Sequence, residues 1–184
     1  MDTAIYVLLA VAAVGVVWAI ITLNGFVRAR NLVDESWSGV DVQLKRRHDL
    51  VPNLVETVKG YAAHESGVLE KVTEARAQAM AASEPEQQGR AEASLTSALG
   101  GIRAVAEQYP QLRASENFQR LQAELAEIED QIQAARRIYN SNVRAYNTRL
   151  QIFPNSLLAH GYQPRRFFEI EDPAERAVPA VAFG

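Results

Sequence analysis

The feature that most constrains this chain is an apolar run close to its N-terminus. The run extends from Ala4 to Leu23, inside a charge-free stretch from residue 3 to residue 27. A helix of about 20 residues, rising about 1.5 Å per residue, spans the ~30 Å hydrocarbon core of a bilayer. The run therefore predicts a transmembrane helix, and we expect residues 1–27 to form a membrane anchor.

Two other interpretations of the run are a secretory signal peptide and a helix buried in a soluble core. A signal peptide begins with basic residues, whereas this N-terminus has Asp2 and no Lys or Arg before the run. No convincing small-x-small cleavage site follows, so we expect the anchor to remain uncleaved. Arg28 and Arg30 come soon after it, and the positive-inside rule then places the N-terminus outside and the C-terminal part in the cytoplasm. The absence of cysteine fits a cytoplasmic domain.

The rest of the sequence predicts an all-α fold, because it is rich in Ala, Leu, Glu, Gln and Arg. Three long helices are expected: from the membrane to Ala81, from Glu84 to Tyr109 and from Ser115 to Phe153. Their short connections predict antiparallel neighbours. We therefore expect residues 28–162 to form a helical bundle, ending in a short helix from Asn155 to His160. The 19 basic and 22 acidic residues nearly balance, which argues against nucleic acid as a partner.

The third helix carries an apolar seam whose steps alternate between three and four residues, as in a coiled coil. Asn142 is the polar member of this seam, where a buried amide would fix the register of packing. Charge is divided along the helix, because residues 116–130 carry five acids and one Arg, while residues 136–149 carry four Arg. This division either complements the helix dipole, which we favour, or supports antiparallel pairing of two copies.

The first helix contains a proline in the middle of its seam. Pro52 has no N–H to donate to the carbonyl of His48, and its ring crowds that carbonyl. Because the seam stays in phase across Pro52, we predict a kink there rather than a chain reversal. Arg47 and Glu65 are charged residues at seam positions. They would lie ~27 Å apart on one helix, so each needs a partner on another helix or another chain.

The helix lengths leave the membrane-proximal part of the first helix without cover. On a straight layout the second helix returns only to about the level of residue 56, so residues 28–51 have no neighbour within the chain. Either the first helix folds over at Pro52, or this stretch contacts another subunit or partner. The candidate interaction surface comprises Trp37, Val40, Leu44, Arg47, Val51 and Glu65.

The last segment, residues 163–184, combines three prolines with several large apolar residues. The prolines oppose helix formation, and the apolar residues oppose complete disorder. We expect an extended tail that docks on the bundle or on a neighbouring copy through Phe167, Phe168, Val181 and Phe183.

No pattern in the sequence indicates catalysis or a bound metal or cofactor. His48, His64 and His160 are scattered, and neither Glu-x-x-His nor His-Glu-x-x-His occurs. The sequence has no glycine-rich phosphate loop and no cysteine nucleophile. We therefore expect a protein that is not an enzyme and that uses no cofactor.

Two long motifs resemble those of a known bacterial family. They are RNLVDESWSGVDVQLKRRHDLVPNLVETVKGYAAHE, from Arg30 to Glu65, and ENFQRLQAELAEIEDQIQAARRIYNSNVRAYNTRLQIFPNSLLAHGY, from Glu116 to Tyr162, with a closing FFEIE and VPAVAF. Over nearly the whole chain after the anchor, the sequence resembles the LemA family. The resemblance implies a bacterial plasma-membrane protein with one N-out anchor and a domain of long antiparallel helices. It implies no catalytic residues, and it links the chain to membrane organisation or to stress.

Two functions from different classes follow. The first is a membrane-anchored scaffold that self-associates through its helical domain and organises the membrane or cell envelope. The second is an adaptor that presents its bundle to an envelope enzyme such as a membrane stress metalloprotease. The expected partners are therefore the membrane, further copies of this chain and, for the adaptor, an envelope protein.

Overall fold

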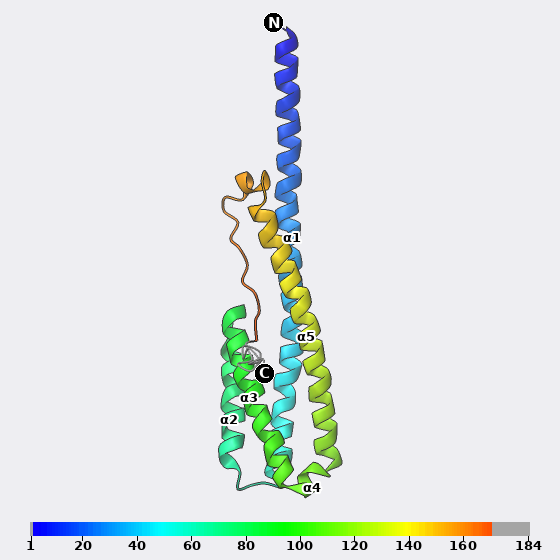
Figure 1. Cartoon of the computed structure of the whole chain (residues 1–184), viewed down its shortest axis with the longest axis vertical. Helices are drawn as coiled ribbons and strands as arrows, with labels where there is room; N and C mark the ends of the chain where they lie inside the picture. The colour runs from blue at the N-terminus through cyan, green and yellow to red at the C-terminus, as the bar shows by residue number, and fades with distance from the viewer. Residues whose placement is uncertain (1, 171–184) are drawn as a thin grey trace, which may run out of the picture. The chain divides into compact units, whose positions relative to one another are not determined.

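A computed structural model of the chain describes residues 2–170, and all regular secondary structure in this range is helical. The elements are α1 (Asp2–Lys59), α2 (Ser66–Ala81), α3 (Pro85–Gln108), α4 (Pro110–Arg113), α5 (Glu116–Gln151) and the 3-10 turn η1 (Asn155–Leu158) (Figure 1). The predicted all-α class is therefore confirmed. The chain divides into two compact units, each described by itself below. Unit 1 is Met1–Gly39 with Arg137–Arg166, and unit 2 is Val40–Arg136 with Phe167–Gly184.

The helix expected to reach Ala81 ends earlier, and this corrects the predicted layout. α1 runs through Pro52 without a break and stops at Lys59, and α2 begins at Ser66. Gly60 follows the last turn of α1, a typical position for a helix to end. Within the turn, the N–H of Ala62 donates to the carbonyl of Val58, and the N–H groups of Val68 and Leu69 donate to the carbonyl of Glu65.

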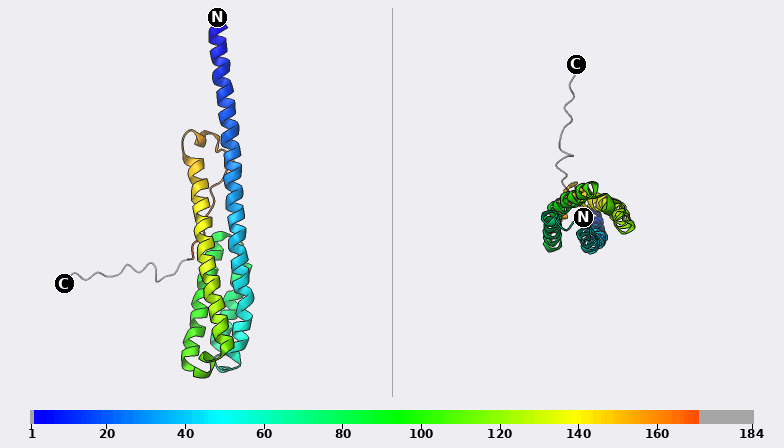
Figure 2. Two further views of the ribbon diagram at one scale, coloured as in Figure 1. Left: turned by 90° about the vertical axis from the view of Figure 1, so that its right-hand side faces the viewer. Right: turned by 90° about the horizontal axis from the view of Figure 1, so that it is seen from below.

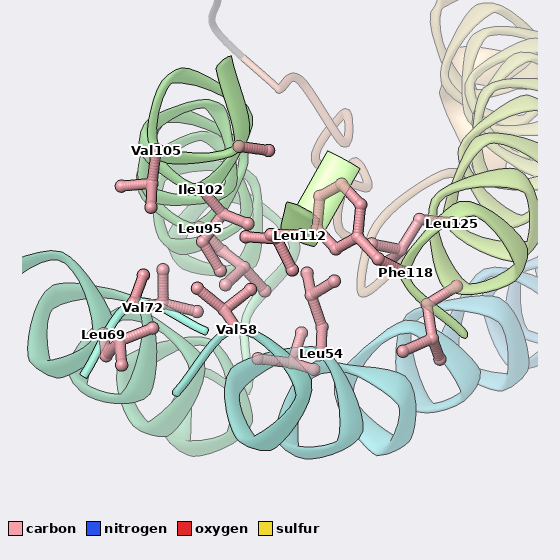
Figure 3. Packing of buried hydrophobic residues seen from close by; sticks show 14 of the residues in the cluster. Leu54, Val58, Leu69, Val72, Leu95, Ile102, Val105, Leu112, Phe118 and Leu125 are labelled. Carbon is pink, nitrogen blue, oxygen red and sulfur yellow. The ribbon is translucent and has the colours of Figure 1, made fainter. Parts of the chain in front are cut away.

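Unit 2 has its core between α1, α2, α3, α4 and α5 (Figure 3). α2 and α3 are antiparallel neighbours, as their short connection predicts (Figure 1). Figure 3 shows the side chains that meet in this core: Leu54 and Val58 of α1, Leu69 and Val72 of α2, Leu95, Ile102 and Val105 of α3, Leu112 of α4, and Phe118 and Leu125 of α5. All five α-helices in residues 2–170 thus supply residues to one buried core.

The expectation that the membrane-proximal stripe lacks cover within the chain is wrong for most of its residues. Val40, Leu44 and Val51 are at most 2 % exposed. The reason is the early end of α1, because α3 and α5 then both lie beside this stretch: Glu92 of α3 contacts Arg47, and Glu129 and Gln131 of α5 contact Arg47 and Arg46. These three residues are core positions of unit 2, not a free surface.

Unit 1 pairs the first part of α1 with the end of α5 and the turn that follows it (Figures 1 and 2). Two aromatic contacts hold the helices together. The rings of Phe26 and Tyr162 lie 5.0 Å apart, and those of Trp37 and Tyr139 lie 5.1 Å apart, both in the tilted arrangement that aromatic pairs prefer.

After η1 the chain turns at Gly161, whose φ of 92° favours glycine, and returns in an extended conformation. The side-chain amide of Asn147 clamps this returning segment, since its Nδ2 donates to the carbonyl of Arg165 at 2.9 Å and its Oδ1 accepts from the N–H of Arg165 at 2.8 Å. The hydroxyl of Tyr139 donates to the carbonyl of Arg166. The guanidinium of Arg165 pairs with Asp34 of α1 at 2.8 Å.

The returning segment continues into unit 2, where Phe168 is fully buried and Phe167 is 36 % exposed. Gly89 of α3 makes room for its backbone, because a Cβ at this position would lie 2.1 Å from the carbonyl oxygen of Glu169. Val181 and Phe183, the other residues expected to dock, lie outside the described residues.

Replacement of Gly89 by alanine should therefore release the segment around Phe168. Limited chymotrypsin digestion of the full chain, read by mass spectrometry, should show faster cleavage after Phe167 and Phe168 in Gly89→Ala. Gly100→Ala is the matched control in the same helix, since its Cβ would meet nothing within 4 Å and it should stabilise the helix by up to about 1 kcal/mol. Equal cleavage in the two variants would contradict the close approach.

Candidate functional site

The most distinctive site in the described chain is a charged cluster inside unit 2, centred on Glu92 of α3. Glu92 has no exposed surface, although carboxylates are rarely buried completely. Its Oε2 lies 3.0 Å from Nη1 of Arg47, and its Oε1 lies 2.7 Å from Nε2 of His48. Nε2 of Gln88 donates to the same Oε1 at 2.9 Å. Both carboxylate oxygens are thus engaged by groups of this chain.

Arg47 is the second centre of this Glu92 cluster and joins three helices. From α1, its Nη1 reaches Glu92 of α3, and its Nη2 donates to Thr96 at 2.7 Å and lies 3.4 Å from Glu129 of α5. The partner that the seam position of Arg47 demands is therefore inside the chain. Its Nε is buried without a hydrogen-bond partner in the described part of the structure. The cluster therefore links α1, α3 and α5 through one buried side chain.

His48 makes two contacts outside α1, one through its side chain and one through the backbone carbonyl that Pro52 leaves free. The side chain of His48 binds Glu92, while its carbonyl, which Pro52 leaves without the usual helical donor, accepts from Nε of Arg76 at 2.7 Å. Arg76 belongs to α2, so α2 supplies the hydrogen bond that α1 lacks. The helix continues through Pro52, and the kink expected at this residue stays a prediction.

Glu65 finds its partner just beyond the end of α3, where the hydroxyl of Tyr109 donates to its Oε1 at 3.2 Å. Partial burial raises the pKa of the Tyr109 phenol above its ordinary value of 10.0, and the hydrogen bond and negative charge of Glu65 raise this pKa further. The phenol therefore remains a donor at neutral pH, and this pair links the start of α2 to the end of α3.

The remaining residues expected at the site are placed apart from this cluster. In unit 1, Trp37 is half-buried against Tyr139, and Nδ2 of Asn142 donates to the carbonyl of Leu32 over 3.4 Å. Asn142 is only half-buried, while its neighbour Val143 is fully buried. Its role in fixing the register stays a prediction.

Sequence reasoning missed Glu92, Gln88 and Arg76. Glu92 has a recognisable signal, because it lies on the same face of its helix as Leu95 and Ile102, three and ten residues further on. A carboxylate on an apolar stripe needs a buried cation, and the chain offers Arg47 at an equivalent position. Nothing in the local sequence of Arg76 distinguishes it from an exposed helical arginine.

The geometry of the Glu92 cluster favours alignment of helices over chemistry. A general acid or base must reach a proton on a substrate, whereas Glu92 is completely enclosed and bonded by this chain's own groups. Among residues 2–170, no three His, Cys, Asp or Glu residues are grouped in a way that could hold a metal ion.

The fold defines a class of protein: a helical bundle whose first helix carries an apolar window long enough to cross a membrane, with none of that window buried in the chain. The sequence profile of the LemA family matches residues 36–183, and the chain belongs to this family. The resemblance noted in the sequence is thereby confirmed.

Three relatives with curated names illustrate the family. The chain is 25 % identical over 202 residues to magnetosome protein MamQ 2 of Paramagnetospirillum magneticum, an alignment that covers 92 % of this chain and 74 % of the relative. With the same coverage it is 24 % identical to magnetosome protein MamQ of Magnetospirillum gryphiswaldense. It is 26 % identical over 140 residues to protein LemA of Metamycoplasma hominis, covering 74 % of this chain and 63 % of that one. With the apolar helix, these relatives indicate a membrane-associated protein.

Removal of one member of the buried ion pair should lower the free energy of unfolding more than removal of both members. Glu92→Leu leaves Arg47 buried beside only the half-exposed Glu129, and should lower the free energy of unfolding by about 3–5 kcal/mol. The double variant Arg47→Met, Glu92→Leu should recover much of that loss. Chemical denaturation of the full chain in mild detergent, followed by circular dichroism, measures both effects.

The control for this comparison is Glu86→Leu, in the first turn of the same helix. Glu86 pairs with Arg90 at the surface, where its side chain is 46 % exposed, so its removal should change stability by less than about 1 kcal/mol. If the double variant is as unstable as Glu92→Leu, the pair contributes to the free energy of unfolding beyond the mutual neutralisation of its two charges.

The hydrogen bond from Arg76 to the His48 carbonyl can be tested with and without Pro52. Arg76→Met should destabilise the protein by about 1–3 kcal/mol, because it leaves the carbonyl of the buried His48 without a donor. In a Pro52→Ala background the loss should be smaller, since an alanine at position 52 supplies a backbone N–H that can donate to this carbonyl within α1. Thermal unfolding of the wild type, the two single variants and the double variant gives the coupling directly. Equal losses in both backgrounds would mean that Arg76 acts through another contact.

Proposed function

We propose that this protein is a non-enzymatic, membrane-anchored scaffold that self-associates through its helical domain and organises the membrane or cell envelope. The observation that carries the proposal is that α1 contains both the candidate membrane span and one helix of the bundle. No residue of its apolar window is buried within the chain, while its later residues Val40 to Val58 supply part of the core of unit 2. One helix thus offers a membrane span and a side of the bundle.

The Glu92 cluster supports a structural role. It places charged groups from α1, α3 and α5 in one buried network, which specifies a single alignment of these helices. The similarity to proteins named as magnetosome proteins supports a role in organising a membrane.

The charge on α5 supports self-association by antiparallel pairing. Glu124 and Glu127 are exposed in its first half, and Arg137 and Arg144 are exposed in its second half. Within residues 2–170, neither of these two arginines forms an ion pair, and Glu124 pairs only loosely with Arg120, at 3.9 Å. The two halves of the helix thus carry exposed, poorly neutralised charge of opposite sign.

Two copies of α5 that run antiparallel would neutralise both ends. A two-fold axis near Ala134 would bring the acidic half of one copy to the level of the arginine half of the other, without pairing Glu124 directly with Arg144, because these two side chains lie about 160° apart around the helix. Within one copy they are ~30 Å apart along the helix and cannot pair. Such a two-fold contact uses the same surface twice and closes on itself.

Size-exclusion chromatography with light scattering on the full chain in mild detergent tests the scaffold. The expected protein mass is a multiple of 20.3 kDa. The variant Glu124→Arg, Glu127→Arg should lower that mass by repulsion from the arginine end, and the further changes Arg137→Glu and Arg144→Glu should restore it. The control Glu70→Arg, Glu107→Arg makes the same change in net charge at exposed positions of α2 and α3 and should leave the mass unchanged.

A monomer at every concentration would overturn the scaffold and favour the adaptor. Crosslinking in native membranes would then be expected to link the bundle to an envelope protein of a different mass. If wild type is oligomeric but all charge variants behave alike, self-association stands and its surface is not the charged side of α5.

A further inference from the structure

The turn that follows α5 exposes an unusual amount of apolar surface for its length. Ile152 is 49 % exposed, Leu157 is 67 % exposed and Phe153 is 80 % exposed. They lie within six residues of each other, in the turn after α5 and in η1, so the apolar exposure is concentrated in one short segment.

The structure holds this turn next to α1 immediately after the apolar run. Just before the turn, Nη1 of Arg149 donates to the carbonyl of Gly25 at 2.9 Å, and just after it the ring of Tyr162 packs 5.0 Å from that of Phe26. Both contacts lie within unit 1. Figure 1 and the left view of Figure 2 show the turn lying beside α1, at the point beyond which α1 runs on alone.

The exposure of α1 indicates how far the turn reaches along the apolar run. Every residue from 3 to 17 is exposed, whereas Trp18 and Ala19 are half-buried and Thr22 is only 7 % exposed. Trp18, Thr22 and Phe26 are spaced by four residues and share one face of the helix. Cover therefore begins about five residues, or ~7.5 Å, before the run ends at Leu23.

With Ala4 to Leu23 across the bilayer, the turn meets the boundary between acyl chains and headgroups. Interfacial segments bury their apolar side chains about 5–10 Å into this boundary, which matches the reach along α1. Trp18 is also a residue type that is enriched at this level.

The charge of unit 1 fits the same surface. Three arginines lie close to the turn, namely Arg149, which donates to Gly25, and Arg28 and Arg30, which follow Gly25 on α1. Arg165 is instead paired with Asp34. Arginines next to a membrane are attracted to the anionic headgroups of the cytoplasmic leaflet. An apolar tip with basic residues behind it fits a lipid surface better than it fits a second protein.

We propose that the turn from Ile152 to Leu158 inserts into the membrane interface beside α1, with Phe153 and Leu157 as its lipid-contacting residues. The protein then holds the same leaflet at two places, through a spanning helix and an interfacial turn. This proposal rests on the membrane placement of α1 and is independent of self-association.

The chain has no cysteine, so single labelling sites can be introduced in the full protein. Phe153→Cys and Leu157→Cys, each carrying an environment-sensitive nitrobenzoxadiazole label, are reconstituted in vesicles of phosphatidylcholine and phosphatidylglycerol. Lipids with a nitroxide near the headgroup should quench both labels several-fold more than lipids with a nitroxide deep in the acyl chain. Iodide in the water should quench them weakly.

Two further sites make the result decisive. Ile138 is 59 % exposed in the same unit, and the label of Ile138→Cys should be quenched by iodide and not by lipid. Val14 lies in the middle of the apolar run, and the label of Val14→Cys should be quenched by the deep nitroxide. If the label at position 14 behaves so while those at positions 153 and 157 resemble the label at 138, the interfacial turn is wrong and the anchor stands.

Two other outcomes would also overturn the proposal. Labels at positions 153 and 157 that are protected from iodide without quenching by lipid, and that become accessible when the protein is diluted in lipid, would show a second copy of the chain on the patch. A label at position 14 that no lipid nitroxide quenches would remove the membrane placement on which the inference rests.

Discussion

The bonds of the Glu92 carboxylate inside unit 2 are the interaction on which the arrangement of its helices depends. A fully buried carboxylate is costly unless it is paired and hydrogen-bonded, and here Arg47, His48 and Gln88 all contribute. Arg47 extends the network from α1 through α3 to Glu129 of α5. Apolar packing alone would tolerate small slips of one helix along another. A charge network with fixed donors is expected to disfavour such slips, because a slip would leave a buried charge without its partner.

Much of the fold follows from the sequence because helices have a period that apolar residues reveal. The ends of α3 and α5 lie within two residues of expectation, since Pro85, Pro110 and Pro154 mark three of these four ends. The end of α1 does not follow in the same way. Apolar residues on both sides of it keep a helical spacing whether the chain continues or reverses, because α1 and α2 face one core. Periodicity reports which face is buried, while only Gly60 indicates where the helix ends.

For a related reason, the sequence predicts which charged residues of the candidate site need partners, but it does not predict the partners. Charges at seam positions identify Arg47 and Glu65 as residues that need partners, and both have them. The choice of partner depends on which helices are neighbours, and that depends on where α1 ends. With a longer α1, Val40, Leu44 and Val51 need either a fold-back at Pro52 or a contact with another subunit or partner. The rule that apolar residues are covered thus predicts correctly that these residues are buried. The expected helix lengths, however, assign the wrong element to cover them.

The missing hydrogen bond at Pro52 has a consequence for how the protein matures. Most helices complete the backbone hydrogen bonds of their inner turns within their own sequence. The turn of α1 at His48 cannot, because its carbonyl is satisfied by Arg76, a residue 28 positions further along the chain. This stretch is therefore complete only after the hairpin of α2 and α3 has docked. The proline thereby ties one turn of α1 to the docking of a distant helix, while the neighbouring turns complete their bonding within α1.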